Sequence, residues 1–424
     1  MIYERNWRAK RKWAIGLCSM IFIAISLLGA SITLAEGNVY EKPGQFQASA
    51  ILKPELLKGK YHTVQENVIN DGLFNHYTVE SQFGVFQSGS TNSLKILVHE
   101  INAIAAMKQV EVDDTVMSSM KKSGENTLAG IQNLITDPQG TVEGAASGVG
   151  SLFNRAKVTV GNRKPTSAED SRLEQFIGLS KAKGEIASKY GVNMYSRNSK
   201  LQEELDRLAQ ADYLGGLGVG VATSFIPGVG GLILSTSGTA RLLNEAINTT
   251  PASELWLQNQ KKLLAMGMDG DTVELFLNNP SFSPAMTTVL VTALDSMAGV
   301  ENRELFVKVS LQASTPDMAK TITEIAVMSA GYHKEIAPLK SFASLARVTM
   351  GIRKDMTRVI LLPIDYLIWN KRIADVANDY NRESKGKSFE IWSLGTLSKK
   401  STSEFQKLAW KIHIEAGPRL IPKP

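Results

Sequence analysis

The chain has 424 residues, of which 43% are hydrophobic and 21% are charged. This composition is ordinary for a globular protein and allows two or three domains, each with its own core. The formal charge of +6 falls to +2 without the first 35 residues, because 42 basic and 40 acidic residues then remain. The chain after residue 35, called the body below, is therefore close to neutral. It lacks the excess of positive charge that is typical of nucleic-acid-binding proteins, so we expect no nucleic-acid partner.

The N-terminus has the pattern of an export segment. A basic start with five Lys or Arg residues precedes the uncharged stretch Trp13–Ala35. Small residues at Thr33 and Ala35 predict cleavage before Glu36. The apolar run exceeds a usual signal core of about 7 to 15 residues and approaches the roughly 20 that span a bilayer. Both a cleaved signal peptide and an uncleaved anchor therefore stay open, and either one places the body outside the cytoplasm.

The only cysteine, Cys18, lies inside this export segment. Leu17 precedes it and apolar residues follow it, which does not fit a lipoprotein attachment site. Cleavage would leave a mature chain without disulfides, thiolate catalysis or cysteine-ligated zinc. A disulfide-free exported chain of this size favours a bacterial envelope.

Alternating residues predict a small antiparallel β-meander near the N-terminus. After a short strand at Phe46–Leu52, two alternating runs flank Asn70-Asp71-Gly72, and a third run ends near Gly89. Asp-Gly between such runs is a hairpin signal. We expect this sheet to cover part of a helical body.

Apolar spacing predicts a helix over Leu94–Val110. It contains His99-Glu100, but Ala103 stands where a zinc-protease helix needs its second histidine. No metal site is predicted there or elsewhere in the chain, and no cofactor motif is complete.

The most distinctive stretch is Tyr213–Ala240, 28 uncharged residues with eight glycines and a central Pro227. As a helix, each half would span about 20 Å, which is less than a bilayer core of about 30 Å. We expect two short helices in a hairpin; burial in the helical domain, insertion into a membrane and a glycine-rich loop all stay open. Small or turn-forming residues at helical spacing form the expected packing or membrane interface: Gly216, Gly220, Ser224, Pro227, Gly231 and Ser235 here, and Gly140, Gly144 and Gly148 upstream.

Short helices are predicted from residue 169 to about 340. Gly191 fits a helix C-cap, while Ser283 and Thr315 fit N-caps followed by proline. The irregular spacing of these helices does not indicate a repeat.

The last segment changes to β-α-β-α-β. Strands are expected at Arg358–Ile364, Phe389–Leu394 and Trp410–Ile414, with helices between them. This order predicts a parallel sheet with right-handed crossovers. Ligands of such sheets bind beyond the carboxyl ends of the strands, which makes the candidate ligand residues Asp365, Gly395, Thr396 and Ser398. Asp365 and Ser398 also fit helix N-caps.

A catalytic constellation is not complete anywhere in the chain. The weak candidates are His333 with Glu335, which share one helical turn beside Tyr332, and Asp365. Dinucleotide, phosphate-loop and nucleophile-elbow motifs each lack a required residue.

The sequence as a whole predicts an α+β fold that is mostly α-helical. The expected divisions are a signal peptide or anchor (1–35), an arm and β-meander (36–92), a helical segment with a glycine ridge and linker (93–170), a helical domain with the hairpin 213–240 (171–355), and a small α/β unit (356–424). The function we expect is that of an exported, non-enzymatic envelope protein of the periplasm or cell envelope. It would act through a protein or lipid interface with a membrane or envelope partner. The alternative is an exported hydrolase with its site near His333 and Glu335 or near Asp365.

Overall fold

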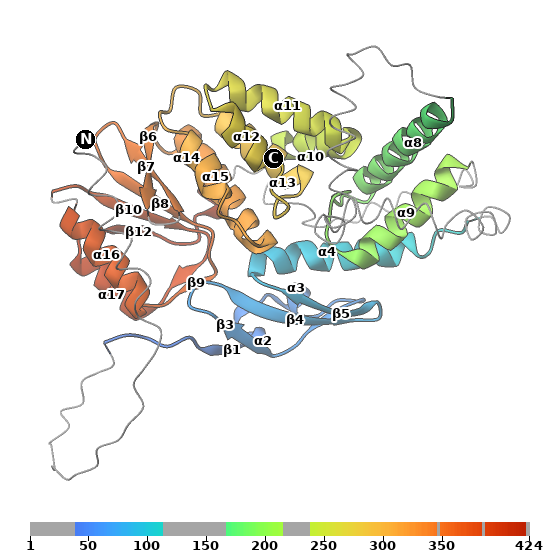
Figure 1. The fold of residues 1–424 in the computed structure, drawn as a ribbon. Coiled ribbons are helices and arrows are strands. Elements are labelled where there is room, and N and C mark those ends of the chain that lie inside the picture. The colour runs from blue at the N-terminus through green and yellow to red at the C-terminus, as the bar shows by residue number, and fades with distance from the viewer. Residues whose placement is uncertain (1–38, 113–166, 215–237, 346–347, 384–385, 421–424) are drawn as a thin grey trace, which may run out of the picture. The chain divides into compact units, whose positions relative to one another are not determined.

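The computed structural model describes residues 39–112, 167–214, 238–345, 348–383 and 386–420 (Figure 1). The described residues from Tyr40 onward belong to one compact unit. The predicted export segment, the ridge of Gly140, Gly144 and Gly148, and the hairpin positions 216–235 lie outside the described residues.

The predicted N-terminal antiparallel meander is confirmed. Its elements are β1 (Gln45–Gln47), α2 (Ala48–Ile51), α3 (Pro54–Leu57), β2 (Thr63–Val64), β3 (Asn67–Asn70), β4 (Asn75–Ser81) and β5 (Gly84–Ser88). β3 pairs with both β1 and β4, while β2 and β5 pair with β4, all antiparallel. The turn between β3 and β4 contains Asp71-Gly72, as expected. The first strand is shorter than predicted because the chain turns into α2 at Ala48, where alanines favour a helix.

Helices make up the middle of the chain, as the sequence predicts. They are α4 (Thr91–Met107), α8 (Ser167–Lys189), α9 (Ser199–Tyr213), α10 (Gly238–Thr249), α11 (Ala252–Ala265), α12 (Gly270–Leu277), α13 (Pro284–Asp295), α14 (Glu304–Ser310) and α15 (Pro316–Glu335). None of the described helices is both long enough and apolar enough to traverse a bilayer.

Local signals set the ends of these helices. The hydroxyls of Ser283 and Thr315 accept the N–H groups three residues ahead, each at 3.2 Å, and proline follows both caps. Gly191 follows α8 in a left-handed conformation, with φ of 65°. Because a β-carbon would be strained in that conformation, glycine suits this C-terminal turn.

The predicted parallel β-α-β-α-β order is confirmed in the C-terminal region. Its elements are β6 (Leu339–Leu345), β7 (Val348–Arg353), β8 (Arg358–Leu362), β9 (Tyr366–Leu367), α16 (Lys371–Glu383), β10 (Phe389–Ser393), β11 (Thr396–Leu397), α17 (Lys399–Lys407), β12 (Lys411–His413) and α18 (Gly417–Leu420). The main sheet has the order β12-β10-β8-β7-β6, with β8, β10 and β12 parallel.

The main sheet is larger than predicted, because β6 and β7 form an antiparallel hairpin beside β8. The sequence interpretation placed these residues at the end of the helical domain. The pairing register of β6 and β7 shifts between Leu339 and Ser341. The alternation of inward and outward side chains, which is the sequence signal of a strand, is interrupted there.

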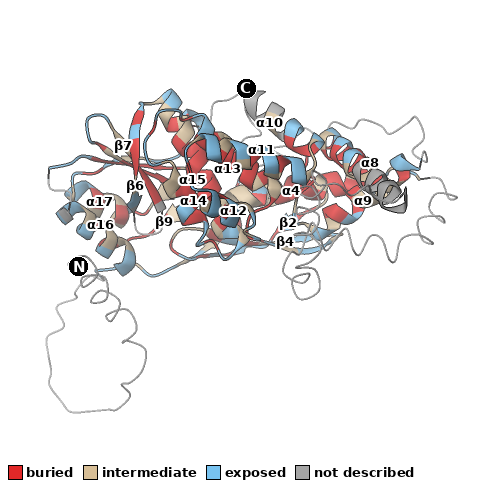
Figure 2. Cartoon of the chain, turned by 45° about the horizontal axis from the view of Figure 1, so that its top comes forward, coloured by how far each residue is buried: buried red, intermediate tan, exposed pale blue. Residues whose placement is uncertain are grey.

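Helices cover both faces of this sheet (Figure 1). Val359 and Leu361 belong to the large core that includes α14 and α15, whereas Ile360 packs in the core with Ala374 of α16 and Phe405 of α17. This alternation is the period of a β-strand buried on both sides. Figure 2 shows the buried residues in red along α13 and α15, between the meander and the sheet.

Gly331 lets α18 approach α15 closely near the C-terminal end of α15. A β-carbon on Gly331 would lie 1.7 Å from the carbonyl oxygen of Leu420, the last residue of α18. Both the α15 and α18 backbones would have to shift to accommodate it.

We expect Gly331→Ala to lower the free energy of unfolding by about 3 kcal/mol, because overpacking against backbone cannot relax through a rotamer change. Gly270→Ala is the matched control, since no atom lies within 4 Å of the added β-carbon at the start of α12. It should leave stability unchanged or raise it by up to about 1 kcal/mol. Urea denaturation of both variants is the measurement, and equal midpoints would contradict the packing role of Gly331.

Candidate functional site

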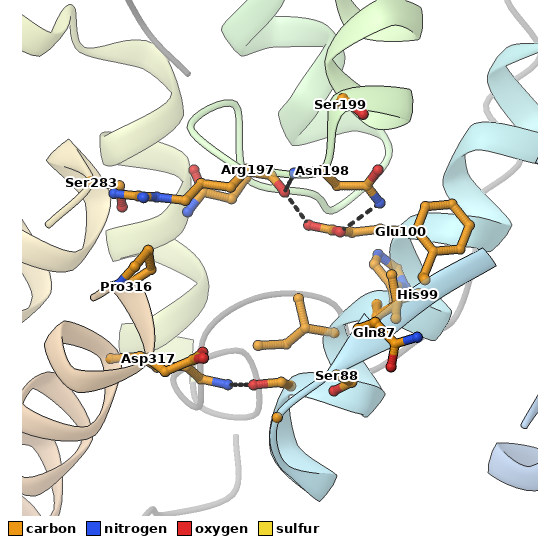
Figure 3. Close-up of a pocket in the computed structure, with 18 of the residues that line it drawn as sticks. Gln87, Ser88, His99, Glu100, Arg197, Asn198, Ser199, Ser283, Pro316 and Asp317 are labelled. Carbon is orange, nitrogen blue, oxygen red and sulfur yellow. Dashed lines mark hydrogen bonds between the residues drawn. The ribbon is translucent and has the colours of Figure 1, made fainter. Parts of the chain in front are cut away.

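A cavity of about 630 Å³ is the candidate functional site. Its wall is built by β5, α4, the segment between α8 and α9, and the N-terminal ends of α9, α13 and α15 (Figure 3). Segments from residue 76 to residue 320 therefore meet around one space. Its volume is within the range of about 300 to 1,000 Å³ that is typical of small-molecule sites.

Glu100 is the buried carboxylate of the cavity wall and is 7% exposed. Its Oε1 accepts the hydroxyl of Ser196 at 2.5 Å, and its Oε2 accepts the side-chain amide of Asn198 at 3.0 Å (Figure 3). Burial raises the pKa of Glu100, against the opposite effect of these two hydrogen bonds and of Lys320. Asn198 is also the N-cap of α9, so the cap and the carboxylate fix each other.

His99 lies beside Glu100 and is 4% exposed. Its Nε2 lies 3.2 Å from the carbonyl oxygens of both Tyr190 and Gly191, so this nitrogen carries the proton, because a carbonyl oxygen only accepts. Burial lowers the pKa of His99, which favours the neutral ring. The other nitrogen, Nδ1, is buried and has no hydrogen-bond partner among the described residues.

Lys320 of α15 also lines the cavity. Its Nζ contacts Oγ of Ser93 and lies 3.7 Å from Oε1 of Glu324. Glu324 also accepts the side-chain amide of Asn92 at 2.7 Å. The side chains of Lys320 and Glu324 are only 11% and 7% exposed, and burial raises the pKa of Glu324.

The predicted ligand residue Asp365 joins distant parts of the chain instead of capping the helix that follows it. Its Oδ2 accepts the backbone N–H groups of Asn75 at 2.9 Å and Thr91 at 3.0 Å. Thr91 is the first residue of α4, so this carboxylate lies at a helix N-terminus, where negative charge is stabilised. Burial nevertheless raises the pKa of Asp365 overall.

The structure brings the other predicted ligand residues close to Asp365 through the backbone. Thr396 N–H donates to the carbonyl oxygen of Asp365 at 3.0 Å, and a β-carbon on Gly395 would lie 2.0 Å from that oxygen. Ser398 is the N-cap of α17, as the alternative interpretation predicts, and its hydroxyl donates to Glu41 at 2.6 Å. A carboxylate of the chain itself therefore lies beside the cap, and none of the four predicted residues lines the cavity.

The structure does not bring His333 and Glu335 together as a pair. Nδ1 of His333 accepts the backbone N–H of Leu339 at 3.0 Å, whereas Glu335 lies 3.2 Å from Nζ of Lys334. The adjacent Tyr332 is fully buried and donates to Glu390 at 3.1 Å. Burial lowers the pKa of His333.

Sequence reasoning missed the cavity because its residues are far apart in the chain. It considered Glu100 only as part of a zinc motif and did not single out Lys320 or Glu324. The available signal was an acidic residue inside the apolar stripe of a helix, Glu100 beside Ile101 and Glu324 beside Ile325. Charged residues are seldom fully buried unless they are paired, so such positions indicate a polar cluster. No group of three metal-ligating side chains converges among the described residues.

The buried carboxylate of Glu100 should make stability depend on pH. Because its pKa is raised on folding, the folded chain retains a proton that the unfolded chain has already released, so stability falls as pH rises from the ordinary carboxyl pKa to the raised value. Glu100→Gln should remove this contribution. The stability of the variant relative to the original chain should then increase with pH across that window and level off above it.

Urea denaturation at a series of pH values measures this difference. Glu203→Gln, at an exposed position of α9 paired with Lys200, is the control for loss of one charge. A difference for Glu100→Gln that does not vary with pH would contradict the prediction.

Comparisons with protein-family models, with curated proteins and with solved structures each found no match. The function is therefore inferred from the residues of the chain itself.

Proposed function

We propose that the chain is an exported, non-enzymatic binding protein of the bacterial envelope, which holds a small polar ligand in the cavity beside α4. The observation that carries the binding role is the cavity itself, with the buried polar groups of Glu100 and His99 in its wall. Burying such groups is costly unless they are hydrogen-bonded, so a ligand that bonds to them would lower that cost.

Export and the partner are proposed from the sequence. The basic start and the apolar stretch Trp13–Ala35 support transfer to the periplasm or cell envelope. The near-neutral body favours an envelope protein or lipid over nucleic acid as partner. We place this partner contact on the small-residue positions within 213–240, and the proposal involves no cofactor and no metal ion.

An exported hydrolase is the second candidate, and one contact in the cavity favours it. Ser93 and Lys320 touch, and a hydroxyl beside an amine is a known arrangement for nucleophilic catalysis. However, Lys320 is already engaged in an ion pair with Glu324, whose Oε1 lies 3.7 Å from its Nζ. Asp365 and His333, the candidates from the sequence, already bond to backbone N–H groups. Binding is therefore the better-supported role.

Fractionation of the expressing cells tests export. We expect the body in the envelope fraction, with mass analysis showing an N-terminus at Glu36, or the complete leader if Trp13–Ala35 is retained as an anchor. A carbonate wash separates these outcomes from loose association, since an anchored chain resists it. Full-length protein free in the cytosol would contradict the proposal.

Native mass spectrometry tests ligand binding with the chain purified from its own envelope fraction. We expect a non-covalent increment of a small molecule, which Ser199→Trp should abolish by filling the cavity from the start of α9. Ser253→Trp, at an equivalent exposed position near the start of α11, is the control and should retain the increment. A chain that carries no increment would contradict binding, whereas an increment that survives denaturation would favour the hydrolase, because it would be covalent.

A further inference from the structure

The strand β5 is an edge strand of the meander and lies at the cavity. Among the described strands it pairs only with β4, and this pairing has no register shift. Residues 85–89, which belong to β5 and the position after it, line the cavity without a gap. Figure 3 shows Gln87 and Ser88 at the cavity. An edge of the meander therefore borders the candidate site.

The pairing register decides which backbone groups of β5 point away from β4. A two-residue turn joins the strands, so the pair that closes it, which includes Gly84, is hydrogen-bonded, and so is every second pair after it. Val85 and Gln87 lie between these bonded pairs, so their N–H and C=O groups point to the outer edge. The residue opposite Gln87 agrees with this assignment. It is Thr78, whose carbonyl oxygen accepts the N–H of Gln65 at 2.9 Å on the other side of β4.

This outer edge is open among the described residues, because no other element bonds to the backbone of Val85 or Gln87. Edge strands are commonly protected by lysine, proline, a bulge or a covering segment. The strand β5 has the sequence Gly-Val-Phe-Gln-Ser and no bulge. By contrast, Glu301 covers the edge strand β6, where it bonds to Lys340 and Phe342 through the backbone at 3.0 Å. The edge of β5 therefore offers unpaired donors and acceptors to a further strand.

The charged side chains that line the cavity balance one another. Glu100 and Asp317 stand against Arg197 and Lys320. The wall also contains apolar side chains, such as Met286. Such a wall does not select a ligand by net charge. The directional groups that remain are those of the β5 backbone, which match the backbone of another extended chain.

We propose that the ligand of this cavity is an extended peptide segment that adds a strand to the outer edge of β5. This inference rests on the proposed binding function and names the class of its ligand. An extended peptide carries N–H and C=O groups with the same repeat as β5, so its backbone can bond to Val85 and Gln87. Every second side chain then points to the face of the sheet that α4 covers, and the cavity of about 630 Å³ receives it. Main-chain hydrogen bonds supply affinity in this mode of recognition, and pockets for alternate side chains supply specificity.

Reversible disulfide tethering tests the proposal with synthetic peptides. The full chain with Cys18→Ser has no cysteine, since Cys18 is the only one. In that background, Ser199→Cys places a thiol in the cavity wall, and Ser253→Cys places one at an exposed position of α11 as a reference. The probe is an uncharged peptide of alternating threonine and valine with a terminal cysteine. Its counterpart has the same sequence but is methylated at its backbone nitrogens, so it cannot pair as a strand.

The measured quantity is the concentration of β-mercaptoethanol that releases half of each tethered peptide. On Ser199→Cys, we expect the unmethylated peptide to need about tenfold more reductant than the methylated one, because methylation removes at least two backbone hydrogen bonds. On Ser253→Cys, both peptides should be released at the same concentration. The reference removes any difference in the reactivity of the two peptide thiols.

Gln87→Pro tests the edge itself. Proline has no N–H, but at an outward-facing position of an edge strand it removes no bond to the neighbouring strand. We expect this variant to lose the tenfold difference. Gln45→Pro is the matched control on β1, the other edge strand of the meander, and should retain it. Gly44 accepts the N–H of Asn70 at 2.9 Å, so the next residue, Gln45, points outward. Val85→Pro replaces Gln87→Pro if circular dichroism shows that the latter is unfolded.

The outcomes separate the peptide ligand from the binding function. Equal release of the two peptides from Ser199→Cys would overturn the peptide ligand, as would a difference that survives in Gln87→Pro. If cystamine reacted with Ser199→Cys but neither peptide did, the peptide ligand would fall while binding of a smaller molecule stood. If cystamine reacted only with Ser253→Cys, the cavity would be closed to solutes and the binding function would fall too. A dimer of the original chain that Gln87→Pro dissociates in analytical ultracentrifugation would assign the edge to a second copy and contradict the proposal.

Discussion

The arrangement of the described elements depends most on the hydrogen bonds that the carboxylate of Asp365 accepts. It follows the first parallel strand of the C-terminal sheet and accepts backbone N–H groups from β4 and from the start of α4. These partners lie 290 and 274 residues away in the chain. One side chain thus fixes the meander and the first long helix against the C-terminal sheet. Because α4 carries His99 and Glu100, the same contact also sets the position of the cavity wall.

Acidic side chains at helix ends recur in this molecule. Asp365 meets the start of α4, Glu100 bonds to the cap of α9, and Glu41 bonds to the cap of α17. The helix N-terminus stabilises the negative charge of each carboxylate, whereas the loss of hydration destabilises it. The net effect on the charged form therefore differs from site to site. For Asp365 and Glu100 the loss of hydration dominates, and the pKa of each is raised. Glu100 lines the cavity, whereas Asp365 lies outside its wall and is connected to it through the start of α4.

Local signals made much of the fold predictable from the sequence. The Asp71-Gly72 turn, the caps at Ser283 and Thr315 and the β-α-β-α-β order each depend on neighbouring residues, and the structure has them all. The hairpin of β6 and β7 was missed because a register shift interrupts its alternation. The cavity could not be predicted in the same way. Glu100 and Lys320 are brought together by tertiary packing, and no spacing within one segment encodes their proximity.

The contact between Glu41 and Ser398 has a consequence for the order in which the chain can fold. Glu41 belongs to the first described residues, yet its carboxylate accepts the N–H of Trp369 and the hydroxyl of Ser398, which is 357 residues away. Bringing together residues so far apart in the chain costs conformational entropy, and such non-local contacts slow folding. The link between Glu41 and the C-terminal region therefore forms only after almost all of the chain has been synthesised. Until then, the strands of the meander can pair with one another but lack their contacts with the C-terminal region.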